Sequence, residues 1–253
     1  MTPGMAPPGS LRHRSTQSEW PGSLRHCSTQ SEWMDTETVT PEDFAACLAD
    51  LAIVNTVTLA RQPTLGFMRR IARRNPGKTL RVLDVGCGEG DMLRRLHRWG
   101  ARAGHRLELV GLDMNAQGNQ AARAATPSSM NVEYRTANIF DPDLGRFDVI
   151  LSSLFTHHLT DDQVVDFLGV MEDHARLGWF VNDLHRNPVA YHGFRALSAA
   201  AGWHRFVRHD GPISVARSFR RDDWEALLVR AGLSGTAQIR WHLPFRFCIQ
   251  RFA

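Results

Sequence analysis

The chemically most informative stretch of the chain is VLDVGCGEGDMLRRL, which runs from Val82 to Leu96. An apolar run leads into three closely spaced glycines, Gly86, Gly88 and Gly90, and a segment with helical spacing of its leucines follows. Glycines allow positive φ angles and let a ligand approach the backbone closely. A strand, a glycine-rich turn and a helix in this order are typical of sites for nucleotide-like ligands.

Two common ligands of such loops are disfavoured by the residues around the glycines. A dinucleotide site requires G-x-G-x-x-G, and Asp91 occupies the position of the third glycine. A carboxylate at that helix N-terminus is unfavourable beside a pyrophosphate. A P-loop requires G-K-[ST], which does not follow the glycines. Asp84, two residues before the first glycine, also argues against a polyanion.

The neighbouring side chains instead fit a ligand that carries an amine, a carboxylate and a ribose. Backbone N–H groups of the loop can bind the carboxylate, and Asp84 suits the amine, directly or through water. Asp113 ends the next apolar run, and one carboxylate can accept hydrogen bonds from both vicinal hydroxyls of a ribose. Met114 offers a polarizable apolar surface to an adenine ring, with a place in the core as the alternative.

Hydrophobic periodicity places these residues in an alternating α/β chain. We predict strands over 80–85, 107–112, 132–136, 147–152 and 179–184, and helices over 91–103, 116–125, 161–175 and 221–231. Two N-terminal helices precede them, the first capped by Thr40 and the second over 65–74. Only Pro244 separates the last strands, 236–243 and 245–252, which predicts an antiparallel hairpin. Residues 185–219 fit neither period and are predicted to form an insertion above the sheet. The fold class is therefore α/β, a Rossmann-like seven-stranded sheet, mostly parallel, with helices on both faces.

These motifs together resemble the class I S-adenosylmethionine-dependent methyltransferases over residues 40–253. DVGCGEG, the acid Asp113 and FDVILSSLFTHHLTDD carry the resemblance, which is strongest to small-molecule enzymes of ubiquinone and menaquinone biosynthesis and of phenolic polyketides. It implies S-adenosyl-L-methionine as the cofactor. The implied cofactor contacts are Asp84, Gly86, Cys87, Gly88, Gly90, Asp113, Met114, Asn138, Ile139, Ser152 and Ser153. Asn138 stands where the family often has an acid, and its carbonyl oxygen can accept the same hydrogen bond.

Three histidines stand just past predicted strands, where open α/β sheets place their ligands. His157 and His158 follow the fourth strand, and His185 follows the fifth. A phenol ionises near a pKa of ~10, so a base that titrates near neutral pH would assist methylation. We predict that one of the three is this base, with loop capping or packing as the alternative for each. His157 and His158 lack the i, i+4 spacing of a helical metal pair and no nearby acid completes a site with them, so no metal is predicted.

The predicted activity is methyl transfer to a hydrophobic small molecule, phenolic or quinonoid, on oxygen or on carbon. The acceptor pocket is expected to use Phe155, Trp179, Tyr191, Phe194 and Trp203, under a lid that includes His209, Asp210 and Arg217. These three are otherwise solvated loop charges. SSLF replaces the [DNS]-P-P-[YFW] motif of nucleobase amino methyltransferases, and the arginines alternate with acids, so nucleic acid is a disfavoured partner. An RNA or protein methyltransferase and a non-catalytic cofactor-binding protein remain the alternatives.

Residues 1–33 contain a 13-residue duplication, PGSLRHRSTQSEW followed by PGSLRHCSTQSEW. Each copy has one leucine and one tryptophan, too little apolar surface to fold alone. We therefore predict a disordered, dispensable leader over 1–33 and a methyltransferase domain over 34–253. Four cysteines without CxxC spacing fit a reducing, cytoplasmic location. No apolar run approaches the roughly 20 residues that span a bilayer, and the oligomeric state is left open.

Overall fold

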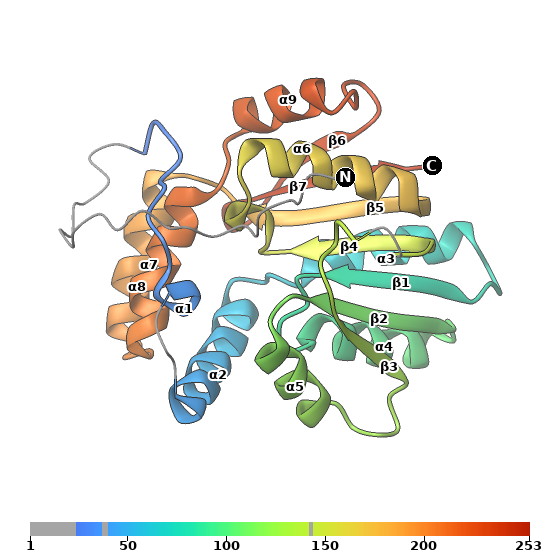
Figure 1. The fold of residues 1–253 in the computed structure, drawn as a ribbon, viewed down its shortest axis with the longest axis horizontal. Helices are drawn as coiled ribbons and strands as arrows, with labels where there is room; N and C mark the ends of the chain where they lie inside the picture. The colour runs from blue at the N-terminus through green and yellow to red at the C-terminus, as the bar shows by residue number, and fades with distance from the viewer. Residues whose placement is uncertain (1–23, 37–39, 142–143) are drawn as a thin grey trace, which may run out of the picture.

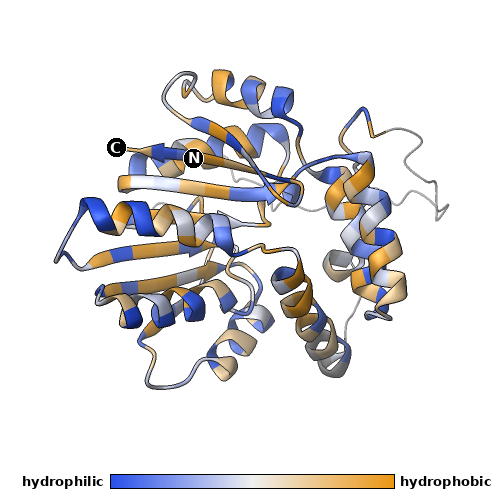
Figure 2. Ribbon diagram, turned by 180° about the vertical axis from the view of Figure 1, so that it is seen from behind, coloured by the Kyte–Doolittle hydropathy of each residue, from blue (hydrophilic) through white to orange (hydrophobic). Residues whose placement is uncertain are grey.

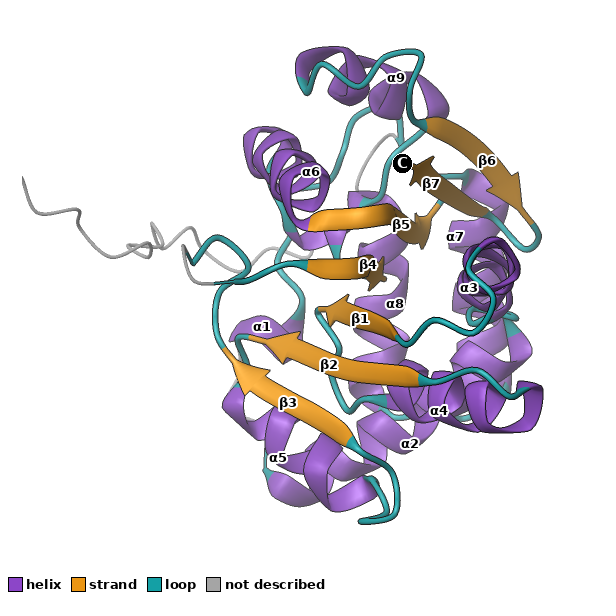
Figure 3. Ribbon diagram, turned by 90° about the vertical axis from the view of Figure 1, so that its right-hand side faces the viewer, coloured by secondary structure: helices purple, strands orange, loops and turns teal. Residues whose placement is uncertain are grey.

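The structure is a computed structural model, and it describes residues 24–36, 40–141 and 144–253. One sheet of seven strands forms its centre, in the order β3-β2-β1-β4-β5-β7-β6. The strands are β1 (Leu80–Val85), β2 (Leu107–Asp113), β3 (Val132–Thr136), β4 (Phe147–Ser153), β5 (Ala175–Leu184), β6 (Gln238–His242) and β7 (Arg246–Phe252). Figure 3 shows them as a twisted fan.

The pairing within the sheet confirms the predicted fold class. Strands β1 to β5 run parallel to one another. Strand β7 lies antiparallel between β5 and β6. Parallel strands need crossover connections, and helices supply those from β1 to β2, from β2 to β3 and from β4 to β5.

Helices cover both faces of the sheet because its strands bury both of their faces. On one face lie α3 (Gln62–Arg74), α4 (Asp91–Ala103) and α5 (Ala116–Ala125), and on the other α6 (Asp161–His174) and α9 (Arg221–Arg230). In β1, Val82 packs into the first layer and Leu83 into the second, which reflects the two-residue period of a strand. The central strands are accordingly coloured mostly hydrophobic in Figure 2.

The carboxyl ends of the parallel strands point toward a group of helices at one side of the molecule (Figure 1). This group contains α1 (Trp33–Thr36), α2 (Pro41–Val57), α7 (Pro188–Ala200) and α8 (Arg205–Arg217). Thr40 caps α2 as predicted, since its hydroxyl accepts a hydrogen bond from the N–H of Asp43 at 3.1 Å. A short 3-10 turn, η1 (Thr156–His158), follows β4 at the same side.

The predicted insertion over 185–219 consists largely of the two helices α7 and α8. The helical period of α8 was missed because the helix contains Pro212 in its interior, directly after Gly211. Both residue types normally interrupt a helical pattern. Strand β5 also begins four residues before the predicted position, since Ala175 to Gly178 carries a weak strand signal. Among the described residues, the structure has no helix with the length and apolarity needed to cross a membrane.

The second copy of the duplicated leader differs from the expectation of a disordered segment. Residues 24–33 lie against α8 and the segment that follows it. The N–H of Ser28 donates to the carbonyl of Ala216 at 3.0 Å, and the Arg220 side chain donates to the carbonyl of Leu24 at 2.6 Å. The copy has too little apolar surface to fold alone, but it docks on a surface that α8 provides. Residues 1–23, which include the first copy, lie outside the described residues.

Candidate active site

The glycine loop has the backbone conformation that its sequence predicts. Gly86, Gly88 and Gly90 have φ angles of +68°, +50° and +74°, a region that strains other residues. A Cβ atom on Gly86 would come within 2.8 Å of the Phe155 ring, and one on Gly90 would collide with the Tyr134 hydroxyl. The loop therefore packs closely against two aromatic rings while its other side stays open.

This open side borders a cavity of about 190 Å³, which we call the loop cavity. Of the predicted site residues, Asp84, Gly86, Cys87, Gly88 and Ser153 line it. Helix α2 contributes Leu48, Leu51 and Asn55, and Arg61, Glu89, Asp91 and Met92 are further lining residues. The contribution of α2 was missed because its apolar stripe resembles that of any core helix.

Asp84 and Asp113, the two acidic residues predicted to bind the ligand, have different environments. Asp84 is buried, and its burial, together with the charges of Asp113 and Asp91, raises its pKa to about 7. Asp113 accepts hydrogen bonds from the N–H groups of Gly88 and Asn115, both at 2.8 Å. It therefore ties the glycine loop to the end of β2. A carboxylate has about four acceptor sites, so acceptor capacity remains for a ligand hydroxyl.

The other predicted cofactor contacts, which include Asp113, are not among the described lining residues of the loop cavity. Met114 follows Asp113 and is 68% exposed. Asn138 is half-buried, and its carbonyl oxygen accepts a hydrogen bond from Phe140 N–H at 3.1 Å. Ile139 packs in the hydrophobic core, and the buried Ser152 hydroxyl donates to the Val85 carbonyl at 3.1 Å. The side chains of Ile139 and Ser152 thus have packing roles.

Cys87 is buried and packs in the hydrophobic core beneath the glycine loop. Burial, followed by the nearby charges of Asp84 and Asp113, raises the pKa of its thiol. The thiol also lies 3.8 Å from the amide oxygen of Asn119, in hydrogen-bonding geometry. A buried, protonated thiol is a weak nucleophile, so Cys87 shapes the loop without taking part in covalent chemistry.

A second cavity, of about 230 Å³, adjoins the loop cavity, and we call it the histidine cavity. The two share Leu51, Asn55 and Leu154 as lining residues. Leu154 has a φ angle of +57°, a conformation that costs of order 1 kcal/mol or more outside glycine. Such strain commonly marks functional positions. His157, His158, Phe194 and Glu32 are among the residues that line the histidine cavity.

His157 is held by a fully buried carboxylate at the end of β5. Its ring Nδ1 lies 2.7 Å from Asp183 Oδ1, and its backbone N–H donates to Asp183 Oδ2 at 3.0 Å. The Thr156 hydroxyl and the Leu184 N–H also donate to this carboxylate. Burial alone would raise the pKa of Asp183, but the charge of His157 and these hydrogen bonds lower it to about 2. An ionised Asp183 fixes the ring with Nε2 directed away from it.

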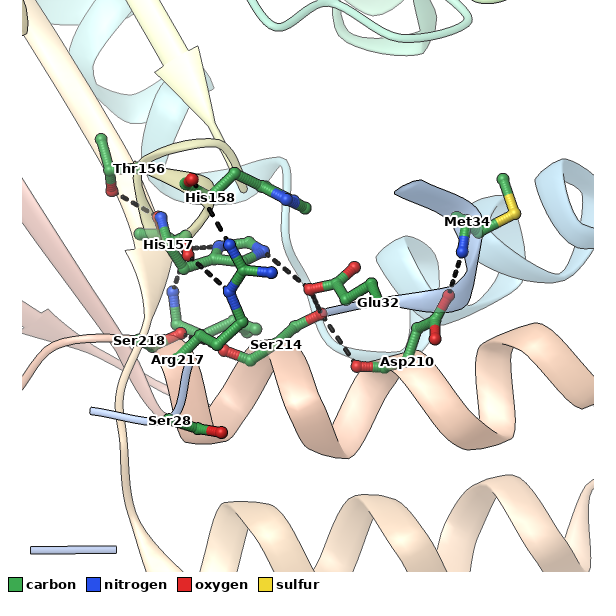
Figure 4. Close-up of polar contacts among 12 residues, drawn as sticks. Ser28, Glu32, Met34, Thr156, His157, His158, Asp210, Ser214, Arg217 and Ser218 are labelled. Carbon is green, nitrogen blue, oxygen red and sulfur yellow. Dashed lines mark hydrogen bonds and ion pairs between the residues drawn. The ribbon is translucent and has the colours of Figure 1, made fainter. Parts of the chain in front are cut away.

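The docked leader contributes an acid beside this ring (Figure 4). Glu32 is 7% exposed, and its Oε1 lies 3.8 Å from His157 Nε2 and accepts a hydrogen bond from the Ser214 hydroxyl at 2.8 Å. Arg217 donates to the backbone carbonyls of His157 and His158, at 3.0 and 3.3 Å. Glu32 had no signal in the sequence, because it stands in a repeat that cannot fold alone.

The remaining predicted acceptor and base residues are dispersed. His185 is not among the described lining residues of either cavity, and its Nδ1 accepts a hydrogen bond from Trp241 at 3.3 Å. Burial, then the charges of Arg220 and Arg186, lowers its pKa. Of the predicted aromatic lining, Phe194 lines the histidine cavity, whereas Phe155 packs on the glycine loop and Trp179, Tyr191 and Trp203 are buried in hydrophobic clusters.

The lid residues contact the leader. The His209 ring stacks on Trp33 with a centroid separation of 3.5 Å and an interplanar angle of 9°. The Asp210 carboxylate accepts hydrogen bonds from the N–H groups of Trp33 and Met34, at 2.8 and 3.0 Å. All three predicted lid residues, His209, Asp210 and Arg217, are thus engaged in ordered contacts and do not act as solvated charges.

Comparison with known proteins agrees with this geometry. Residues 82–178 match a family model described as a methyltransferase domain. A ubiquinone biosynthesis O-methyltransferase from Roseobacter denitrificans is 31% identical over 170 residues, which cover 62% of this chain and 65% of that protein. The chain thus spans slightly less than two thirds of that relative's length.

Solved structures show the same fold at low sequence identity. The plantazolicin methyltransferase BpumL with SAH aligns with a TM-score of 0.62 and 10% identity, over 87% of this chain and 92% of that chain. The plantazolicin methyltransferase BamL aligns with a TM-score of 0.60 and 15% identity, over 82% and 73%. The family match and the Roseobacter denitrificans relative confirm the predicted resemblance to S-adenosylmethionine-dependent methyltransferases, and the solved structures share the fold of this chain.

Proposed function

We propose that this protein methylates a hydrophobic, hydroxyl-bearing aromatic small molecule of the phenol or quinol class, on oxygen or on an activated ring carbon. The observation that carries the proposal is the contact between the two cavities. The loop cavity has the acids and glycines for the cofactor, and the histidine cavity meets it at Leu51, Asn55 and Leu154. The ubiquinone biosynthesis O-methyltransferase relative supports this class of acceptor.

S-adenosyl-L-methionine supplies an electrophilic methyl group on a sulfonium centre. Asp84 in the loop cavity would bind its ammonium group, and Asp113, which holds the glycine loop at Gly88, would accept hydrogen bonds from its ribose hydroxyls. The N–H groups of the glycine loop would bind its carboxylate. Met114, Asn138 and Ile139 would lie at the adenine, where backbone groups of the latter two can contribute in place of their side chains.

The histidine cavity would orient and activate the acceptor. Its apolar walls, which include Val54 and Phe194, suit an aromatic ring and exclude water. The acceptor hydroxyl must lose its proton for its oxygen, or the ring carbon beside it, to attack the methyl carbon. His157 and His158 line this cavity whereas His185 does not, so we assign the activation of the hydroxyl to the first two.

Calorimetry and methyl transfer followed by mass test the proposal. Asp113→Ala should weaken S-adenosylmethionine binding by about 2 kcal/mol, roughly 30-fold, because a charged hydrogen-bond partner is lost. NADH should bind neither form. His157→Gln and His158→Gln should each lower turnover of a phenol or quinol by roughly 10²–10⁴-fold with nearly unchanged cofactor affinity, while His185→Gln serves as the matched control and keeps its turnover.

Two results would contradict the proposal. Unchanged S-adenosylmethionine affinity in Asp113→Ala would remove the cofactor assignment. Methylation of RNA, with no transfer to any compound in a panel of phenols and quinols, would assign the enzyme to a different acceptor class.

A further inference from the structure

Glu32, His157 and His158 place metal-ligand atoms close together at the wall of the histidine cavity. One ligand atom from each side chain lies within 4.8 Å of both others. Glu32 and His157 are buried and His158 is half-buried. No metal was predicted from the sequence because no nearby acid completes a site with the two histidines, and the docked leader supplies such an acid.

The three ligand types form a set that transition metals prefer. Two imidazoles and one carboxylate, with further positions open, occur in catalytic Zn²⁺ sites and in other divalent-metal enzymes. Metal–nitrogen and metal–oxygen bonds of about 2.1 Å each can bridge atoms up to about 4.2 Å apart. His157 Nε2 and Glu32 Oε1 lie 3.8 Å apart, so one ion can bind both. A tetrahedral angle would bring them to roughly 3.4 Å, a shift of a few tenths of an ångström.

The surroundings of the three side chains resemble the outer shell of a metal site. A metal-bound histidine commonly donates its second ring N–H to a carboxylate, which fixes the ring orientation and raises its basicity. Asp183 accepts from His157 Nδ1 in this way, and it is fully buried. The Ser214 hydroxyl donates to Glu32, and Arg217 fixes the backbone carbonyls of both histidines. Helix α8 therefore holds both elements that carry a ligand, and Asp183 holds His157 in addition.

We propose that Glu32, His157 and His158 bind one divalent transition-metal ion, with Zn²⁺ as the preferred ion. The inference deepens the proposed function, on which its catalytic role rests. A bound ion would have open positions toward the histidine cavity, where the acceptor hydroxyl is expected. As a Lewis acid it would lower the pKa of that hydroxyl and stabilise the oxyanion, so that His157 and His158 would activate the hydroxyl as ligands of the ion and not as bases. The O–H proton would leave to water at the open side of the cavity.

Titration calorimetry of the full, untagged chain with ZnCl₂, after treatment with a chelator, tests the site. We expect one Zn²⁺ per chain. Glu32→Gln should weaken the affinity by roughly 100-fold or more, beyond the 10–100-fold expected for the outer-shell variant Asp183→Asn. Mg²⁺ should bind far more weakly, because it prefers oxygen ligands. Thermal unfolding with and without Zn²⁺ provides a second measurement.

The duplication offers a matched control for Glu32. Glu19 stands in the same STQSEW sequence in the first copy, so Glu19→Gln should keep the full Zn²⁺ affinity. Because the two copies could exchange at the docking surface, the double variant Glu19→Gln/Glu32→Gln is measured as well. His185→Gln controls for binding to other histidines and should also keep the affinity.

Absence of Zn²⁺ binding to the wild-type chain, or equal affinity in the wild type and the double variant, would overturn the inference. Its failure is separable from failure of the proposed function. S-adenosylmethionine binding that is sensitive to Asp113→Ala, without Zn²⁺ binding, would leave the methyltransferase proposal intact. Zn²⁺ binding without S-adenosylmethionine binding would support the metal site and contradict the methyltransferase proposal.

Discussion

The pKa of Asp84 makes cofactor affinity dependent on pH in a direction that can be calculated. Burial, with Asp113 and Asp91 nearby, raises this pKa to about 7 in the free protein. The ammonium group of S-adenosylmethionine should bind the ionised carboxylate and favour it over the neutral acid. Binding should therefore require Asp84 to lose its proton when the solution pH is below 7.

The magnitude follows from the ionised fraction of Asp84. With a pKa of about 7, roughly half of the molecules are ionised at pH 7 and roughly a tenth at pH 6. The apparent affinity should fall about fivefold between pH 7 and pH 6, and approach tenfold for each further unit, about 1.4 kcal/mol. Measurements should stay below about pH 7.5, since a free α-amino group titrates near 7.7–8.0.

Calorimetry at half-unit steps from pH 5.5 to 7.5 measures this dependence. Asp84→Asn should bind more weakly at pH 7.5 and lose the slope. Asp148→Asn, a change in the same sheet on β4, should keep the wild-type profile. A flat wild-type profile, or an unchanged slope in Asp84→Asn, would refute the assignment of Asp84 to the ammonium group.

The raised pKa of Asp84 also affects the stability of the fold. Ionisation of Asp84 destabilises the folded state, whereas ionisation of a carboxylate in a salt bridge stabilises it. Because the folded-state pKa lies above the ordinary value near 3.9, folding disfavours the ionised form. This destabilisation is absent below about pH 4, grows between pH 4 and 7, and is complete above pH 7. Asp84→Asn should therefore gain stability relative to wild type at pH 8 and not at pH 4, as thermal unfolding without cofactor would show.

Two further predictions concern the leader and the glycine loop. Deletion of residues 1–33 should lower Tm by several degrees, because it removes the stacking of Trp33 on His209 and the hydrogen bond from Trp33 N–H to Asp210. Deletion of residues 1–20 should leave Tm unchanged. Equal Tm values for the two deletions would contradict the docking of the leader. Gly86→Ala should lower both Tm and cofactor affinity, since its Cβ would lie 2.8 Å from Phe155 at a φ of +68°; a wild-type affinity would show that the loop can adapt.

Strong periodicity explains which elements could be predicted from sequence. β1, β3, α4 and α5 have the predicted bounds, because apolar alternation and helical stripes there are bounded by glycine or capping residues. The meeting of Asp84 with the glycine loop and Asp113 was also predictable, since parallel strands end at one edge of a sheet. The direction of the side chains at that edge could not be predicted. Ser152 and Ser153 were both predicted as cofactor contacts, but Ser152 turns into the core and Ser153 lines the loop cavity.

The contribution of the leader to the site could not be predicted from the sequence, because it depends on contacts between segments that lie far apart in the chain. Asp210 and Arg217 were predicted as lid residues and Ser214 was not, and the spacing i, i+4 and i+7 places all three on one face of α8. Along that face they bind, in turn, the start of α1, the Glu32 carboxylate and the carbonyls of the two histidines (Figure 4). One helix face thus fixes the leader and the histidine turn together. A change on this face should consequently affect leader docking and the histidine cavity at the same time, whereas a change at the glycine loop should affect the loop cavity alone.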